Sequence, residues 1–205
     1  GPVQLKPFAH VREHIHGEPV TEIVGLSTFG EPIYVSKSYA VVGTSTSVLQ
    51  LPPNTILHSL AADDSVIVGL CNCGSRLFLQ KMYSFGVGTI SSYIDLPTTI
   101  EHSPAKTAIV QDKTSKAVIA VGTNILLTVS IPSRPFGEEQ IVSVRQGDGE
   151  VDAFVNDASG LCMHIVFAGG PWIQALGDGN IVERTSFTDG RLVAADAMRG
   201  VFVLR

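Results

Sequence analysis

One strand–turn–strand pattern occurs twice in this chain of 205 residues. The first copy covers residues 40–51 and opens with AVVGT, and the second covers residues 119–129 and opens with IAVGT. In each copy two apolar, β-branched runs flank a short polar turn, and a proline follows. Gly43 and Gly122 lie 79 positions apart, which is the size of a small domain. The repeat therefore predicts two copies of one β-rich module.

The composition supports a folded core and argues against two kinds of surface. Hydrophobic residues make up 44% of the chain and charged residues 16%, so apolar burial can stabilise a compact fold. The formal net charge is −5, and the 14 Lys and Arg residues are scattered. A nucleic-acid surface or a membrane-binding face requires clustered Lys and Arg. We therefore expect neither nucleic acid nor membrane as a direct partner.

The cysteines favour an intracellular, reducing compartment. Their number, 3, is odd, and the chain has no Asn-x-Ser/Thr glycosylation site. Small secreted domains are instead commonly framed by paired cysteines. Residues 1–17 are interpreted as an N-terminal extension, because Gly1 and Pro2 match the remnant that a tag-cleaving protease leaves.

Short apolar runs with period-two alternation dominate the chain, and Gly, Pro, Asn and Asp separate them. Helical patterns are scarce, with residues 192–199 one of two short candidates. The segment 97–106 holds two prolines and small polar residues, so we place a module boundary there. The sequence thus predicts an all-β fold of two tandem antiparallel β-sheet modules, residues 18–100 and residues 105–205.

No group of residues indicates catalysis or metal binding. Cys71 and Cys73 have no second ligand pair at a suitable spacing. His10, His14 and His16 cluster near the N-terminus, and His10 and His14 are spaced for one helix face, but the segment lacks a third ligand such as a His-Glu-x-x-His motif supplies. No Gly-x-Ser-x-Gly nucleophile motif occurs. We expect no enzyme activity, no catalytic residue, no metal and no cofactor.

Trp172 is the single candidate for a binding residue. It is the only tryptophan and follows the tight turn formed by residues 168–171. A tryptophan at the rim of a hairpin buries a large area in an interface at low entropic cost. The alternative is a core tryptophan whose indole N–H meets a backbone acceptor.

The order of strands and turns resembles the polo box, a β-rich repeat that follows the kinase domain of Polo-like kinases. The resemblance rests on two segments. In residues 36–60 an entry segment, an apolar strand, a polar turn and further strands follow in order. In residues 156–182 turns at 169–171 and 177–180 separate apolar strands. Two such boxes fit a chain of this length.

The polo-box resemblance implies a non-catalytic module that recruits a partner protein and directs localisation. Phosphopeptide-binding boxes carry a His-x-Lys pair, and the corresponding turn at residues 169–172 has no charge. The chain is therefore similar to the divergent boxes of centriolar Polo-like kinases or kinetoplastid kinetochore kinases. This implies a scaffold or kinetochore protein as partner, a role in chromosome segregation, and a nuclear location.

Two other classes of protein fit the pattern. Hairpins recur near residues 40, 66, 119, 165 and 193, which corresponds to about 50 residues per repeat and to four blades of a β-propeller fragment acting as a scaffold. A small β-barrel ligand carrier or enzyme is the third class, and it requires polar groups that converge in a pocket.

Overall fold

The computed structural model confirms an all-β fold. It describes residues 11–27, 30–63, 66–85, 88–97, 106–112, 114–122, 125–131, 140–146, 149–184 and 190–205. Within these ranges every regular element is a strand, and no helix is present that is long and apolar enough to cross a membrane. Residues 192–199, a possible helix from the sequence, instead contain a strand and a turn, because tertiary packing outweighs the weak helical pattern.

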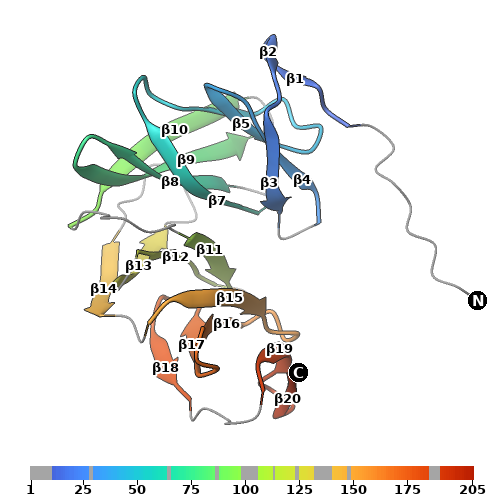
Figure 1. The fold of residues 1–205 in the computed structure, drawn as a ribbon, viewed down its shortest axis with the longest axis vertical. Coiled ribbons are helices and arrows are strands. Elements are labelled where there is room, and N and C mark those ends of the chain that lie inside the picture. Colours follow the sequence, from blue (N-terminus) through green and yellow to red (C-terminus); the bar gives the residue numbers. More distant parts are fainter. Residues whose placement is uncertain are drawn as a thin grey trace, which may run out of the picture.

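The strands form four sheets of four strands and two hairpins, all in chain order (Figure 1). The N-terminal hairpin is β1 (His14–Ile15) and β2 (Glu18–Pro19). Sheet 1 is β3 (Glu22–Leu26), β4 (Pro32–Val35), β5 (Tyr39–Val42) and β6 (Val48–Gln50). Sheet 2 is β7 (Ile56–Ala62), β8 (Val66–Cys73), β9 (Arg76–Phe85) and β10 (Gly88–Asp95).

Sheets 3 and 4 continue the series. Sheet 3 is β11 (Lys106–Gln111), β12 (Lys116–Val121), β13 (Ile125–Ile131) and β14 (Gln140–Gln146). Sheet 4 is β15 (Val151–Asn156), β16 (Cys162–Phe167), β17 (Trp172–Leu176) and β18 (Ile181–Glu183). The C-terminal hairpin is β19 (Leu192–Asp196) and β20 (Val201–Leu204). Each sheet is an antiparallel meander in which neighbours along the chain are neighbours in the sheet.

Period-two alternation sends the side chains of each sheet to two faces, and successive sheets bury these faces against each other. One apolar cluster fills the space between sheets 1 and 2, a second that between sheets 2 and 3, and a third that between sheets 3 and 4. A smaller cluster joins sheet 4 to the C-terminal hairpin, and another joins the N-terminal hairpin to sheet 1. Four-stranded meanders that stack face to face in chain order are the arrangement of blades in a β-propeller.

The predicted boundary between modules at residues 97–106 lies mostly outside the described residues. The apolar cluster on either side of it is continuous: Val68 and Leu79 of sheet 2 pack with Val118 and Val129 of sheet 3. Sheets 2 and 3 therefore share one core. The division into modules 18–100 and 105–205 stays a prediction.

Candidate functional site

The first strands of all four sheets contribute to one cavity of about 370 Å³, which we call the central pocket. Contacts between β7 and β11 and between β3 and β7 bring the first strands of sheets 1, 2 and 3 together. The residues that line the pocket come from sheets 1 to 4: Glu22, Val24, Val35, Leu57, His58, Ser59, Leu60, Lys106, Thr107 and Phe154. The pocket is therefore a product of how the sheets stack.

Two of the lining residues owe their position to β-bulges in the first strands. The register of β3 against β4 shifts between Ile23 and Gly25, so Val24 is the extra residue. The register of β7 against β8 shifts between Leu57 and Ser59, so His58 is the extra residue. A bulge turns a side chain away from the regular alternation. Both extra residues line the central pocket.

The polar groups of the pocket are held by hydrogen bonds. Lys106 donates from Nζ to the carbonyl of Val151 at 2.8 Å and to that of Asp152 at 3.3 Å. The hydroxyls of Ser59 and Thr107 lie 3.0 Å apart, which links sheets 2 and 3. His58 Nε2 lies 2.5 Å from Asn72 Oδ1. The pocket thus combines fixed polar groups with apolar side chains, as ligand sites in proteins commonly do.

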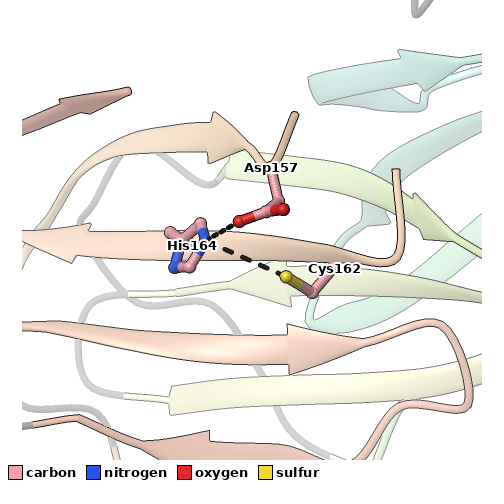
Figure 2. Close-up of side chains that lie close together, drawn as sticks. All are labelled: Asp157, Cys162 and His164. Atoms are coloured by element: carbon pink, nitrogen blue, oxygen red, sulfur yellow. Dashed lines mark hydrogen bonds and ion pairs between the residues drawn. The ribbon is translucent and has the colours of Figure 1, made fainter. Parts of the chain in front are cut away.

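A second group of chemically active side chains lies inside sheet 4 (Figure 2). Asp157 follows β15, whereas Cys162 and His164 belong to β16, and all three are buried. His164 Nε2 is 2.7 Å from Asp157 Oδ2 and 3.8 Å from Cys162 Sγ. Their ligand atoms all lie within 4.8 Å of one another.

The charges in this cluster follow from its hydrogen bonds. Burial alone would raise the pKa of Asp157, but hydrogen bonds from His164, Ser159 and Ala197 outweigh burial and lower this pKa to about 2. Asp157 is therefore ionised at neutral pH, so His164 Nε2 carries the proton that it donates. Burial raises the pKa of the Cys162 thiol to about 11, with a further contribution from the charge of Asp157. The thiol is consequently neutral.

Asp157, Cys162 and His164 offer the oxygen, sulfur and nitrogen ligands that zinc accepts, but their hydrogen bonds favour a structural role. A metal ion would have to replace the proton between His164 and Asp157 and the proton of Cys162. A histidine ligand usually donates its other ring N–H to an acceptor, whereas the buried Nδ1 of His164 has no hydrogen-bond partner among the described residues. Asp157 instead accepts a hydrogen bond from the backbone N–H of Ala197 at 2.9 Å, which joins sheet 4 to the C-terminal hairpin.

Asp157 belongs to a repeat that the sequence analysis did not recognise. An aspartate directly follows the first strand of sheets 2, 3 and 4, at Asp63, Asp112 and Asp157. Each accepts a backbone hydrogen bond within its own turn, from Val66, Thr114 and Ser159 respectively. Asp63 also forms an ion pair with Lys116 of sheet 3, so Asp63 and Asp157 each bond directly to the next element in the series. In the sequence these three aspartates are 49 and 45 residues apart, and this nearly regular spacing was the signal that could have revealed the repeat.

The structure places Trp172 in the core, so its predicted role as a partner anchor is not supported. Its side chain is 2% exposed and packs between sheet 4 and the C-terminal hairpin, with its ring centroid 5.9 Å from that of Phe202. A ring covered in this way has no surface for a partner. The alternative interpretation, a core tryptophan, describes its position.

The other candidates from the sequence lie apart from both sites. Cys71 is buried, which raises its pKa to about 12, whereas Cys73 is exposed at the end of β8. His10 lies outside the described residues. His14 and His16 lie on the N-terminal hairpin, where the His16 ring contacts Tyr39 edge-on at 5.0 Å. Neither histidine belongs to a group of metal-ligating side chains among the described residues.

Comparisons with known proteins add little to this picture. No protein-family model and no curated protein matches the chain. Among solved structures, the chain is similar to apo AztD from Citrobacter koseri, with a TM-score of 0.45 and 16% sequence identity. The similarity covers 82% of this chain and 52% of AztD, so the chain spans about half the length of that protein. A likeness at this level does not indicate a shared function.

Proposed function

We propose that this chain is a non-catalytic protein-interaction module that binds an extended segment of a partner protein at the central pocket. The observation that carries the proposal is the convergence of the first strands of all four sheets on a single cavity. An extended segment carries backbone polar groups and alternating side chains. Such a segment matches a pocket whose walls are both polar and apolar.

Lys106 gives the pocket a directed hydrogen-bond donor. Its ammonium group has three N–H donors, and two are directed to the carbonyls of Val151 and Asp152. The third is available to a carboxylate or a backbone carbonyl of the bound segment. Glu22, on the wall supplied by β3, offers the opposite charge to a basic residue. Val24 and Phe154 offer apolar contacts to the same segment.

The cellular setting is proposed from the polo-box resemblance alone. It suggests an intracellular, nuclear module that docks a scaffold or kinetochore component and directs localisation during chromosome segregation. The uncharged turn at residues 169–172 favours binding that does not depend on phosphate.

Selection from a displayed library of random peptides tests the pocket. We expect the chain to enrich related sequences, and a selected peptide to bind at least about tenfold more weakly to Val24→Glu or Lys106→Met. Val182→Glu, on the exposed side of β18, is the matched control and should bind like the unsubstituted chain. Equal binding by all these variants would refute binding at the central pocket.

Capture of partners from cell lysate tests phosphate dependence. The unsubstituted chain and Val24→Glu serve as paired baits, each with and without phosphatase treatment of the lysate. A partner held by the unsubstituted chain after phosphatase treatment, and lost by Val24→Glu, supports the proposal. Loss of that partner after phosphatase treatment would contradict phosphate-independent binding.

The volume of the central pocket also suits a small molecule, which keeps a ligand carrier as a second candidate. Ligand pockets commonly measure about 300–1,000 Å³, and this one measures about 370 Å³. A ligand that binds the native state raises the melting temperature. A thermal-shift screen in which a compound stabilises the unsubstituted chain but not Val24→Glu would favour the carrier.

A further inference from the structure

The two hairpins at the ends of the series cover different halves of the sheets beside them. The N-terminal hairpin packs Ile15 on Tyr34 and Val41, and β1 contacts β5, the third strand of sheet 1. The carboxylate of Glu18 fixes the hairpin there by accepting hydrogen bonds from the Ser36 hydroxyl and the Ser38 N–H, both at 2.9 Å. This hairpin therefore occupies the position of the third and fourth strands of a preceding sheet.

The C-terminal hairpin occupies the complementary position. Leu192 and Phe202 pack with Val166 and Trp172 of sheet 4, and β19 contacts β15, the first strand of that sheet. A backbone hydrogen bond from Ala158 to Ala195 at 2.8 Å adds to this attachment. Asp196, the last residue of β19, accepts a hydrogen bond from the N–H of Arg199, much as the aspartates after the first strands of sheets 2 to 4 accept bonds within their turns. The hairpin thus stands where the first and second strands of a following sheet would lie.

Each hairpin leaves exposed the apolar side chains that the other half of a sheet would cover. At the N-terminal end, Ile23 and Leu26 of β3 are 50% and 59% exposed, although the first strands of sheets 2 and 3 lie against neighbouring sheets. At the C-terminal end, Val201 and Val203 of β20 are 51% and 47% exposed. The partners that Ile23 and Leu26 lack are first and second strands, and the C-terminal hairpin supplies such strands.

A groove of about 300 Å³ lies between the N-terminal hairpin and sheet 1, and we call it the end groove. Its walls come from the segment before β1, the segment after β2 and the first two strands of sheet 1: Val11, Arg12, Glu13, Val20, Thr21, Glu22, Ile23 and Tyr34. Among the described residues β1 pairs only with β2, so no strand lies at its other edge in this part of the chain. Within the same described ranges β20 pairs only with β19.

We propose that the C-terminal hairpin of one copy of this chain docks in the end groove of a second copy, where the two hairpins form one four-stranded sheet in the order β19-β20-β1-β2. In all four complete sheets the second strand pairs with the third, so β20 pairs with β1. The new sheet stacks on sheet 4 of one copy and sheet 1 of the other. It thereby continues the face-to-face stacking already present within the chain.

The occupant is a second copy because the hairpins of one chain lie far apart. The N-terminal hairpin lies at the top of the molecule and the C-terminal hairpin at the bottom, along its longest axis (Figure 1). A contact between different surfaces of two copies is heterologous, so it adds copies head to tail and forms rings or filaments. The oligomeric state should therefore rise with protein concentration.

Sedimentation velocity over a range of concentrations tests this assembly. We expect the unsubstituted chain to associate, and Val203→Glu and Ile23→Glu each to remain monomeric, because each blocks one of the two complementary surfaces. Val144→Glu, on exposed β14 away from both surfaces, is the control and should associate normally. Circular dichroism of each variant verifies that it is folded, as expected for substitutions at exposed positions.

Mixing the two monomeric variants provides the decisive result. Val203→Glu retains an intact end groove and Ile23→Glu retains an intact C-terminal hairpin, so an equimolar mixture should form a dimer and nothing larger. A monomeric unsubstituted chain at all concentrations would overturn the proposal. Association of either variant alone, or failure of the mixture to form the dimer, would also overturn it.

Discussion

Asp63 and Asp157 occupy the same position in two different sheets, and each attaches its sheet to the element that follows. Asp63 Oδ2 lies 2.5 Å from Lys116 Nζ at the start of β12, and Asp157 Oδ2 accepts a hydrogen bond from the N–H of Ala197 at 2.9 Å. The turn after the first strand is therefore a repeated connection between sheets. Its contribution to stability can be measured one residue at a time.

Substitution of Asp157 should destabilise the fold strongly. In Asp157→Ala the buried Nε2–H of His164 and the N–H of Ala197 lose their acceptor, and each unsatisfied group costs about 1–3 kcal/mol. We expect the free energy of unfolding in urea to fall by more than about 2 kcal/mol. Asp178→Ala is the control, since Asp178 is an exposed turn residue that bonds Asn180, and its loss should cost under about 1 kcal/mol. Equal losses of unfolding free energy in the two variants would show that the buried hydrogen bonds of Asp157 stabilise the fold no more than those of an exposed turn.

The same carboxylate should make stability depend on pH in acid. The pKa of Asp157 is about 2 in the folded chain and about 3.9 when unfolded, so its contribution is complete above pH 4. As the pH falls from about 4 to 2, the unfolded state binds a proton more readily, and about 2 kcal/mol of stability is lost. Urea denaturation at several pH values should show a shallower acid loss for Asp157→Asn than for the unsubstituted chain. Parallel curves would exclude Asp157 as the source.

The ion pair between Asp63 and Lys116 predicts non-additive substitutions. The carboxylate of Asp63 is fully buried and the side chain of Lys116 is 16% exposed, so Lys116→Met leaves a buried charge without this partner and should cost about 3 kcal/mol. In Asp63→Asn/Lys116→Met both charges are absent, while the new amide can still accept from Val66. The free energy of unfolding that the double variant loses should be smaller than the sum of the losses in Asp63→Asn and Lys116→Met by at least about 1 kcal/mol. Additive losses would mean that the pair does not couple sheets 2 and 3.

Gly177 should tolerate no side chain, because it lies against the turn aspartate of sheet 3. A Cβ at this position would stand 2.7 Å from the backbone nitrogen of Asp112, and that backbone cannot move without breaking the turn. Gly177→Ala should therefore destabilise the chain by about 1–3 kcal/mol, the usual cost of overpacking. In Gly169→Ala the nearest atom outside the adjacent residues is Pro171 Cδ at 3.5 Å, an ordinary contact, so thermal denaturation should show a clear loss only for Gly177→Ala.

The sequence predicted the class of the fold because alternation and turn residues are local signals. The turn at Gly74 is an example: Cys73 pairs with Arg76 around it, and Gly74 has a φ of 59° that glycine readily adopts. The central pocket could not be predicted in the same way. It depends on how the sheets stack and on bulges at Val24 and His58, and neither leaves a periodic pattern.

Trp172 shows a second reason why the position of a side chain could not be predicted from the sequence. Its place after a tight turn fits both an interface and a core residue, and its burial depends on packing with the C-terminal hairpin, which follows after β18. Local sequence does not specify such a contact between distant segments. The aspartates at 63, 112 and 157 were equally visible as turn residues, but their contacts with the next element follow from the stacking of sheets.

Trp172→Ala separates the two roles proposed for this residue. A core tryptophan leaves a large cavity when truncated, so we expect the free energy of unfolding to fall by about 3–5 kcal/mol. Val182→Ala changes a partly exposed residue on β18 and serves as the control, since it should lower the free energy of unfolding by under about 1 kcal/mol. A tryptophan that anchors a partner at the surface would instead cost little stability and weaken partner binding. Denaturation of the two purified variants therefore decides whether Trp172 stabilises the junction of sheet 4 with the C-terminal hairpin.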